Sequence, residues 1–232
     1  TGVRCTPGGR PNENPAHRTM PTADNLRSIE LYRRTAAGYD ASTGPTWPIR
    51  MRCIERLTLR PGETVLDVGC GTGLSFEALL QGVGRSGRLI AFEQSPEMHA
   101  QARQRADALR ADGWSVELHC TSAEEVQLGA APDAALWHYV HDITRSPAAL
   151  DNLFAQVRPG MRLAVAGMKF FPWWLAPLNL LAWLKNRPYN VHAHELHEPW
   201  SLLAPRLERF EWEATQWGMG YLGSGVVKAA SR

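Results

Sequence analysis

The sequence predicts an α/β fold: a doubly wound, mostly parallel, seven-stranded Rossmann-like sheet with helices on both faces. Short apolar runs alternate with helical segments through the middle of the chain, and the first run ends in a glycine-rich turn that opens a helix. Strands separated by helices are joined by right-handed crossovers, so they form a parallel sheet that is covered on both sides. A chain of 232 residues fits one such domain with an insertion.

Each predicted strand is a short apolar run bounded by turn residues or by a helical segment. The five runs that begin the sheet cover residues 64–69, 88–93, 115–120, 133–140 and 161–169. The helices predicted between them cover residues 73–81, 96–111 and 147–157. Two strand-like segments near the C-terminus, 210–216 and 221–229, complete the predicted sheet.

The charge balance and the apolar runs exclude several classes of partner. The 25 Lys and Arg residues nearly offset 23 Asp and Glu residues, and no block of like charge stands out, so nucleic acid is not an expected partner. The longest uncharged apolar run, residues 170–184, is too short and too interrupted by proline to span a bilayer. The four scattered cysteines form no CxxC pair, which favours reduced thiols and a cytoplasmic location.

The strongest functional signal is the segment VLDVGCGTG at residues 65–73. Its glycines, Gly69, Gly71 and Gly73, allow a sharp turn and a close approach of the backbone to a ligand. The turn follows the first strand, where open α/β sheets bind nucleotides. The spacing is GxGxG, with Leu74 after the last glycine, so neither the dinucleotide pattern GxGxxG nor a phosphate loop is present. A single nucleoside with a charged amino-acid tail fits this turn better.

VLDVGCGTG resembles the first motif of class I S-adenosylmethionine-dependent methyltransferases, and the resemblance extends from about Tyr32 to Lys169. It implies that S-adenosyl-L-methionine is the cofactor. It also implies that Asp67 and the amides of the turn, Cys70 included, hold the methionine end, where an acid offers an ion pair to the ammonium group. Glu93 ends the second strand, where the family places an acid that accepts hydrogen bonds from both ribose hydroxyls.

The resemblance also implies contacts with the adenosine end of the cofactor. Gln94 and Met98 follow Glu93 at positions where the family often lines the adenosine pocket. The segment Ser122-Ala123-Glu124, after the third strand, resembles the adenine-contacting segment. In that match the backbone of Ala123 lies near the ring, and Glu124 reaches the exocyclic amine.

Tyr39-Asp40, after an apolar helix, resembles the Tyr-Asp pair of ubiquinone-biosynthesis-type and phospholipid methyltransferases. The resemblance implies that Tyr39 closes over the cofactor and takes part in catalysis. Its phenol would hydrogen-bond the cofactor carboxylate, and its ring would face the sulfonium. The alternative is that Tyr39 only caps the helix against the core.

Candidate catalytic residues follow the fourth strand, in the segment WHYVHD at residues 137–142. That strand end flanks the methyl donor in this fold, so Trp137 is expected to contact the cofactor and His138 and His141 are candidate general bases. Methyl transfer otherwise needs mainly an oriented acceptor and the exclusion of water. The alternatives are that His141 and Asp142 cap the next helix and that His138 is packed in the core.

A tryptophan-rich insertion at residues 170–206 interrupts the alternation of strands and helices. Its apolar helix, 173–184, must be covered, because it has no polar face. Three roles stay open for it: a roof over an apolar substrate pocket, contact with a membrane, or a homodimer interface. The roof is favoured, because few basic residues follow the helix. The HAHELH segment matches no zinc-ligand spacing, so no metal is predicted.

The predicted activity is methyl transfer from S-adenosylmethionine to a small, partly apolar molecule. Three alternatives stay open: a phospholipid or quinone-type methyltransferase at a membrane surface, aminocarboxypropyl transfer or cyclisation that releases methylthioadenosine, and a binding protein without activity. The expected regions are a disordered extension at 1–19, N-terminal lid helices at 20–60, a cofactor-binding core at 61–169, the insertion or substrate cap at 170–206, and C-terminal strands at 207–232.

Overall fold

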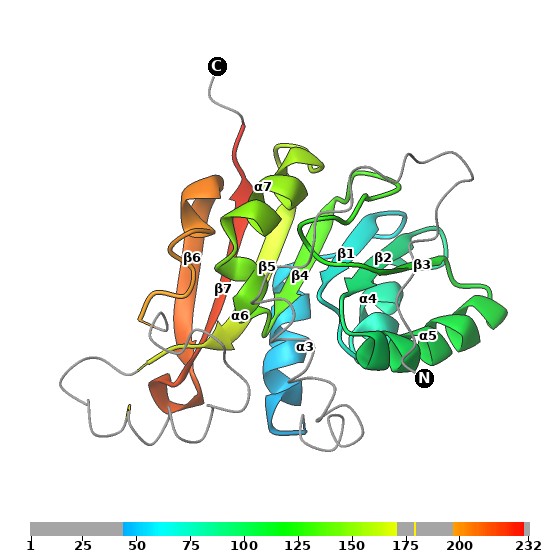
Figure 1. Cartoon of the computed structure of the whole chain (residues 1–232), viewed down its shortest axis with the longest axis horizontal. Helices are drawn as coiled ribbons and strands as arrows, with labels where there is room; N and C mark the ends of the chain where they lie inside the picture. Colours follow the sequence, from blue (N-terminus) through cyan, green and yellow to red (C-terminus); the bar gives the residue numbers. More distant parts are fainter. Residues whose placement is uncertain (1–43, 171–178, 180–196, 230–232) are drawn as a thin grey trace.

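A computed structural model describes residues 44–170, 179 and 197–229. They form one seven-stranded sheet in the order β3-β2-β1-β4-β5-β7-β6 (Figure 1). The first five strands pair in parallel, and β7 pairs antiparallel with both β5 and β6. The strands are β1 Thr64–Val68, β2 Arg88–Glu93, β3 Val116–Cys120, β4 Ala134–His138, β5 Arg162–Met168, β6 Leu207–Thr215 and β7 Gly220–Val227. This topology confirms the predicted fold class.

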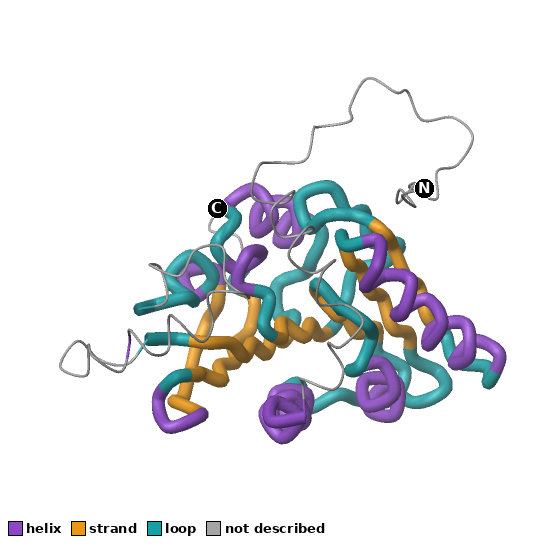
Figure 2. The backbone as a smooth tube through the Cα atoms, turned by 60° about the horizontal axis from the view of Figure 1, so that its bottom comes forward, coloured by secondary structure: helices purple, strands orange, loops and turns teal. Residues whose placement is uncertain are grey.

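Helices cover both faces of the sheet, as the tube in Figure 2 shows. The helices are α3 Trp47–Arg56, α4 Phe76–Val83, α5 Pro96–Ala111, α6 His141–Thr144 and α7 Pro147–Ala155. On one face, apolar residues of α3, α4 and α5 pack on strand residues such as Val65 and Leu89. On the other face, α7 packs on the alternate strand residues, such as Leu66 and Ile90. Because β1 to β5 are parallel, their carboxyl ends share one edge of the sheet, the lower edge in Figure 1.

The helices α5 and α7 begin with the same local signal. Ser95 and Ser146 precede them, and each serine hydroxyl accepts a backbone hydrogen bond from the first turn, from Met98 at 3.4 Å and from Ala149 at 3.2 Å. A proline follows each serine at the first helical position, where its missing N–H costs nothing. Both helices therefore begin at the predicted residue.

The fourth strand is shorter than predicted. It ends at His138, whereas the apolar run suggested that it continues to residue 140. Tyr139 has a φ of 60°, in the left-handed region, and turns the chain out of the sheet. The short helix α6, which the sequence did not predict, begins two residues later at His141.

Three further findings bear on the sequence predictions. Cys53 and Cys70 are free, buried thiols as expected, but Cys120 is disulfide-bonded, so the expected reduced state is wrong there. Within the described ranges, no helix has the length and apolar character needed to cross a membrane. The extension at 1–19 and the first predicted N-terminal helix lie outside the described residues, as does most of the insertion.

Candidate functional site

The glycine-rich turn begins where β1 ends. The N–H of Cys70 donates to the carbonyl of Phe92 at 3.0 Å, which extends the β1–β2 ladder past the last residue of β1. The chain then reverses, and the N–H of Gly73 donates to the carbonyl of Cys70 at 3.0 Å. Gly71 has a φ of +58° and open space where a Cβ would be. The turn therefore presents bare backbone at the carboxyl edge of the sheet.

Glu93, the last residue of β2, is held by this turn. Its Oε2 accepts the N–H of Gly71 at 3.0 Å, and its Oε1 accepts the N–H of Ser95 at 2.8 Å. Burial raises the pKa of Glu93, although these backbone hydrogen bonds oppose the rise. A carboxylate has about four acceptor positions. These two backbone bonds and one from Gln94 use part of this capacity, and the rest is available to a ligand hydroxyl.

Asp67 and Arg50 place opposite charges beside the turn. Asp67 lies on β1, is 2% exposed, and its Oδ2 has no hydrogen-bond partner among the described residues. Burial raises the pKa of Asp67 to about 7, against the opposing effect of the Arg50 cation. Arg50 lies on α3 and is 6% exposed. Its Nη1 donates to Ser75 Oγ at 2.6 Å, but its Nε finds no partner in the same part of the chain. Buried charges with incomplete pairing are costly, so the two groups fit a ligand that carries both a cation and an anion.

One pocket contains these groups and reaches the end of β4. It is lined by Arg50, Asp67, Gly69, Cys70, Gly71, Thr72, Leu74 and His138. His138 is buried, and neither of its ring nitrogens has a partner among the residues that the structure describes. Burial, with the Arg50 cation, holds the pKa of His138 well below its usual value. The imidazole is therefore neutral at physiological pH and keeps a free lone pair.

Comparison with known proteins agrees with this geometry. A family profile described as a methyltransferase domain matches residues 65–160. Over 166 residues the chain is 32% identical to the protein-L-isoaspartate O-methyltransferase of Triticum aestivum. This match covers 64% of this chain and 70% of the wheat protein. The chain belongs to the class I S-adenosylmethionine-dependent methyltransferases.

Two further similarities show how far this methyltransferase resembles others. The N-methyltransferase NodS of Bradyrhizobium japonicum WM9, solved in complex with S-adenosyl-L-homocysteine, shares the fold with a TM-score of 0.62 at 18% identity, over 88% of this chain and 99% of NodS. A 37.1 kDa protein in transposon TN4556 of Streptomyces fradiae is 33% identical over 113 residues, which are 48% of this chain. The matched stretch spans 32% of that relative, so the activity of this methyltransferase is argued below from its own residues.

Three residues that line the methyltransferase pocket were not predicted from the sequence, namely Thr72 and Leu74 of the glycine turn and the charged residue Arg50. Arg50 lies three and four residues before Cys53 and Ile54, which are both buried. Helical spacing therefore places Arg50 on the apolar face of α3. Arginine is almost never fully buried unless it is paired. A charged residue at such a position was the signal that identifies it as a candidate ligand contact.

The predicted adenosine contacts lie near the ends of β2 and β3. They are Gln94, Met98, Ser122, Ala123 and Glu124. None of them lines the pocket beside the turn. The side chains of Met98 and Ala123 are buried, and Glu124 Oε1 accepts the hydroxyl of Ser146 at 2.8 Å. Their contacts with the cofactor stay predictions, as does that of Tyr39, which lies outside the described residues.

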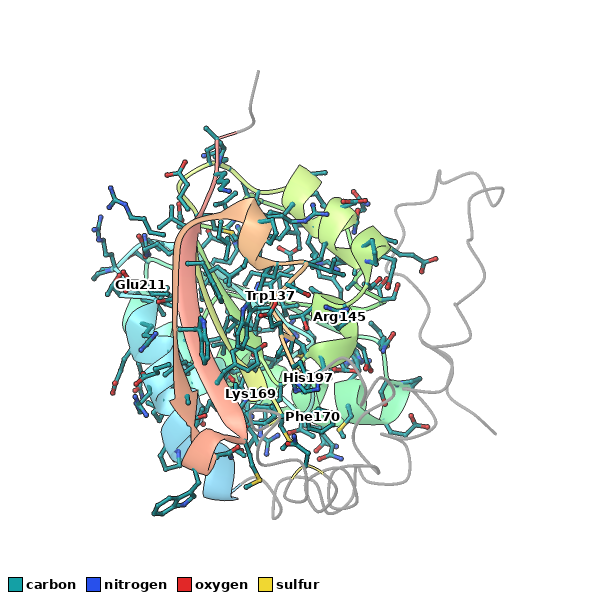
Figure 3. The ribbon with its side chains drawn as sticks, turned by 90° about the vertical axis from the view of Figure 1, so that its left-hand side faces the viewer. Trp137, Arg145, Lys169, Phe170, His197 and Glu211 are labelled. Carbon is teal, nitrogen blue, oxygen red and sulfur yellow. The ribbon has the colours of Figure 1, made fainter. Side chains whose placement is uncertain are left out.

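Two predicted site residues have other roles in this methyltransferase. Trp137 is 1% exposed, is enclosed by other side chains (Figure 3), and packs against Phe154 of α7 with ring centroids 6.4 Å apart. It lies on the sheet face opposite His138, because side chains alternate along β4, and it does not line the pocket, so its contact with the cofactor stays a prediction. Nε2 of His141 accepts the backbone N–H of Met168 at 2.9 Å. That contact occupies the lone pair that a general base would use, so it argues against His141 as the base.

Proposed function

We propose that this methyltransferase binds S-adenosylmethionine beside the glycine turn and transfers the methyl group to a small, partly apolar molecule. The observation that carries the proposal is the pair Arg50 and Asp67, which are buried and opposite in charge, and each of which has one polar atom without a partner among the described residues. The amino-acid end of S-adenosylmethionine carries an ammonium and a carboxylate on one carbon. It complements both groups: Asp67 accepts from the ammonium and Arg50 donates to the carboxylate.

Other residues fit the remaining parts of the cofactor and the reaction. Glu93 keeps acceptor capacity for a ribose hydroxyl, and Gly71 lets the ligand approach the backbone. When bound, S-adenosylmethionine supplies a methyl group that its sulfonium activates. His138 accepts the proton that the acceptor loses, because it is neutral and lies in the pocket wall. Its low pKa means that it takes this proton only as the acceptor becomes acidic during bond formation.

The acceptor site is proposed to include the tryptophan-rich insertion. Two described residues of the insertion, Phe170 at its start and His197, meet with ring centroids 5.5 Å apart in an edge-to-face arrangement. Figure 3 shows both side by side near the end of β5. The insertion therefore leaves and rejoins the domain at the carboxyl edge, where the cofactor pocket also lies. The proposal that the insertion contributes to a partly apolar acceptor site rests on this location and on the apolar character of its sequence.

Identification of the nucleoside product tests this function. The protein is incubated with S-adenosylmethionine alone, with aqueous cell extract, and with the lipid fraction of that extract. Release of S-adenosylhomocysteine with the aqueous extract supports the proposal, whereas a requirement for lipid selects a methyltransferase that works at a membrane surface. Methylthioadenosine as the product would show aminocarboxypropyl transfer or cyclisation instead. The Asp67→Asn variant, which cannot form an ion pair with the ammonium, should release product more slowly.

A further inference from the structure

The ladder between β4 and β5 ends in an unusual way. The register pairs His138 with Ala166, and the N–H of Tyr139 donates to the carbonyl of Ala166 at 2.8 Å. In a regular parallel ladder, the next donor on β5, the N–H of Met168, would donate to the carbonyl of Tyr139. It donates instead to Nε2 of His141 at 2.9 Å. The imidazole takes the place of a backbone carbonyl.

The conformation of Tyr139 explains why a side chain is needed there. Its φ of 60° is a strained value for a residue with an aromatic side chain. A chain that turns out of the sheet at this residue cannot continue the ladder, so the N–H of Met168 needs another acceptor. His141 supplies it from the first residue of α6.

Gly167 leaves the space that this contact requires. A Cβ at position 167 would lie 2.7 Å from Cε1 of His141 and 3.0 Å from the ring of Tyr221. The His141 ring also meets the Tyr139 ring edge-on, with centroids 6.3 Å apart. Burial lowers the pKa of His141 to about 4. The imidazole is therefore neutral, with its proton on Nδ1 and its acceptor lone pair on Nε2.

The residues around His141 lie directly behind the pocket wall at Gly69. Val140 and Ile143 lie so close to Gly69 that a Cβ there would be 2.8 Å and 3.1 Å from them. His138, just before the turn, lines the pocket itself. We propose that His141 is a positioning residue: its imidazole closes the β4–β5 ladder in place of a backbone carbonyl and thereby holds His138 in the pocket wall and Val140 against Gly69.

Two variants separate this role from simple packing. In His141→Gln the side-chain amide can offer an oxygen to the N–H of Met168, whereas His141→Leu fills the space without an acceptor. We expect His141→Leu to bind S-adenosylhomocysteine about tenfold more weakly in calorimetry, because a buried donor loses its partner. His141→Gln should stay close to the wild-type affinity. His119→Leu, which removes a partly exposed imidazole paired with Glu117, is the matched control. Equal losses in the Gln and Leu variants would overturn the proposal.

A second measurement does not depend on the cofactor. The affinity readout rests on the proposed function, but nitrogen NMR of the His141 ring tests the contact directly in the wild-type protein. We expect the neutral tautomer with its proton on Nδ1. A proton on Nε2 would rule out the hydrogen bond from Met168 and so overturn the proposal. If the Nδ1–H tautomer is found in a protein that does not bind S-adenosylhomocysteine, the proposed function fails while the role of His141 in the ladder stands.

Discussion

Arg50 is expected to recognise the amino-acid end of the ligand. A buried guanidinium costs free energy unless an anion lies close to it. The one side-chain partner that the structure gives Arg50 is the neutral hydroxyl of Ser75. The buried Asp67 carboxyl acts on Arg50 electrostatically, and a ligand carboxylate would add an anion that accepts hydrogen bonds from the guanidinium. Arg50 should therefore distinguish ligands that carry the amino-acid end of the cofactor from ligands that lack it.

Replacement of Arg50 by methionine tests this selectivity. A hydrogen bond to a charged group contributes ~1.5–3 kcal/mol, so Arg50→Met should weaken binding of S-adenosylhomocysteine about tenfold to a hundredfold. Binding of methylthioadenosine, which lacks the amino-acid end, should not change. Calorimetry with both ligands measures the difference. Arg52→Met is the matched control, because Arg52 lies on the same helix but pairs with Glu213 at the surface. Equal losses for the two ligands would mean that Arg50 supports only the fold.

The residues of the site differ in how far the sequence could predict them. Asp67 and Glu93 were predictable, because each is an acid at the end of a strand and at a fixed distance from the glycine turn. The role of Arg50 depends on how α3 packs against the sheet. The role of His141 depends on Met168, a strand residue distant in sequence. Contacts of that kind leave no local pattern, which is why the sequence suggested a base at His141.

Two glycines with positive φ, one in the glycine turn and one outside the pocket, distinguish the effect of backbone strain from the effect of ligand contact. Gly71 and Gly160 both have positive φ, 58° and 89°, with open space where a Cβ would be. Alanine at either position should lower the free energy of unfolding by about 1–2 kcal/mol through strain alone. Only Gly71→Ala should also weaken binding of S-adenosylhomocysteine, because Gly160 lies in the turn before β5, outside the pocket. Urea unfolding and calorimetry measure the two effects. Unchanged affinity in Gly71→Ala would contradict the placement of the ligand at this turn.

Helix and strand ends are predicted correctly where signals within one turn of the chain determine them. Helix α5 spans Pro96–Ala111 as predicted, because the capping hydroxyl of Ser95 and the proline after it act within one turn. The end of β4 was predicted two residues too late, because the apolar run continues through Tyr139 and Val140. The left-handed turn at Tyr139 leaves a donor on the neighbouring strand that His141 satisfies. A single sequence does not show such a contact between the start of a helix and a strand distant in sequence.

Across the whole molecule, buried titratable groups change stability with pH in opposite directions. The pKa of Asp67 is raised from 3.8 to about 7, so the folded state keeps a proton that the unfolded chain has lost, and stability falls as pH rises through this range. The pKa of His141 is lowered from 6.5 to about 4, so the unfolded chain binds a proton that the folded state does not. The free energy of unfolding therefore falls as pH falls from 6.5 towards 4. The two effects oppose each other in the wild-type profile, so only a comparison with a variant separates them.

The stability difference between wild type and His141→Gln should therefore depend on pH. Glutamine does not titrate, whereas His141 makes the wild type less stable by up to about 1.4 kcal/mol for each pH unit below 6.5. Between pH 6.5 and about 4 the wild type should lose about 3 kcal/mol relative to the variant. Asp67, Glu93 and His138 are present in both proteins, so their contributions cancel. Urea unfolding of both proteins, from neutral pH down to the acid limit of the folded state, measures the difference. A constant difference would show that His141 takes up a proton as readily in the folded protein as in the unfolded chain, which a buried acceptor for the Met168 N–H cannot do.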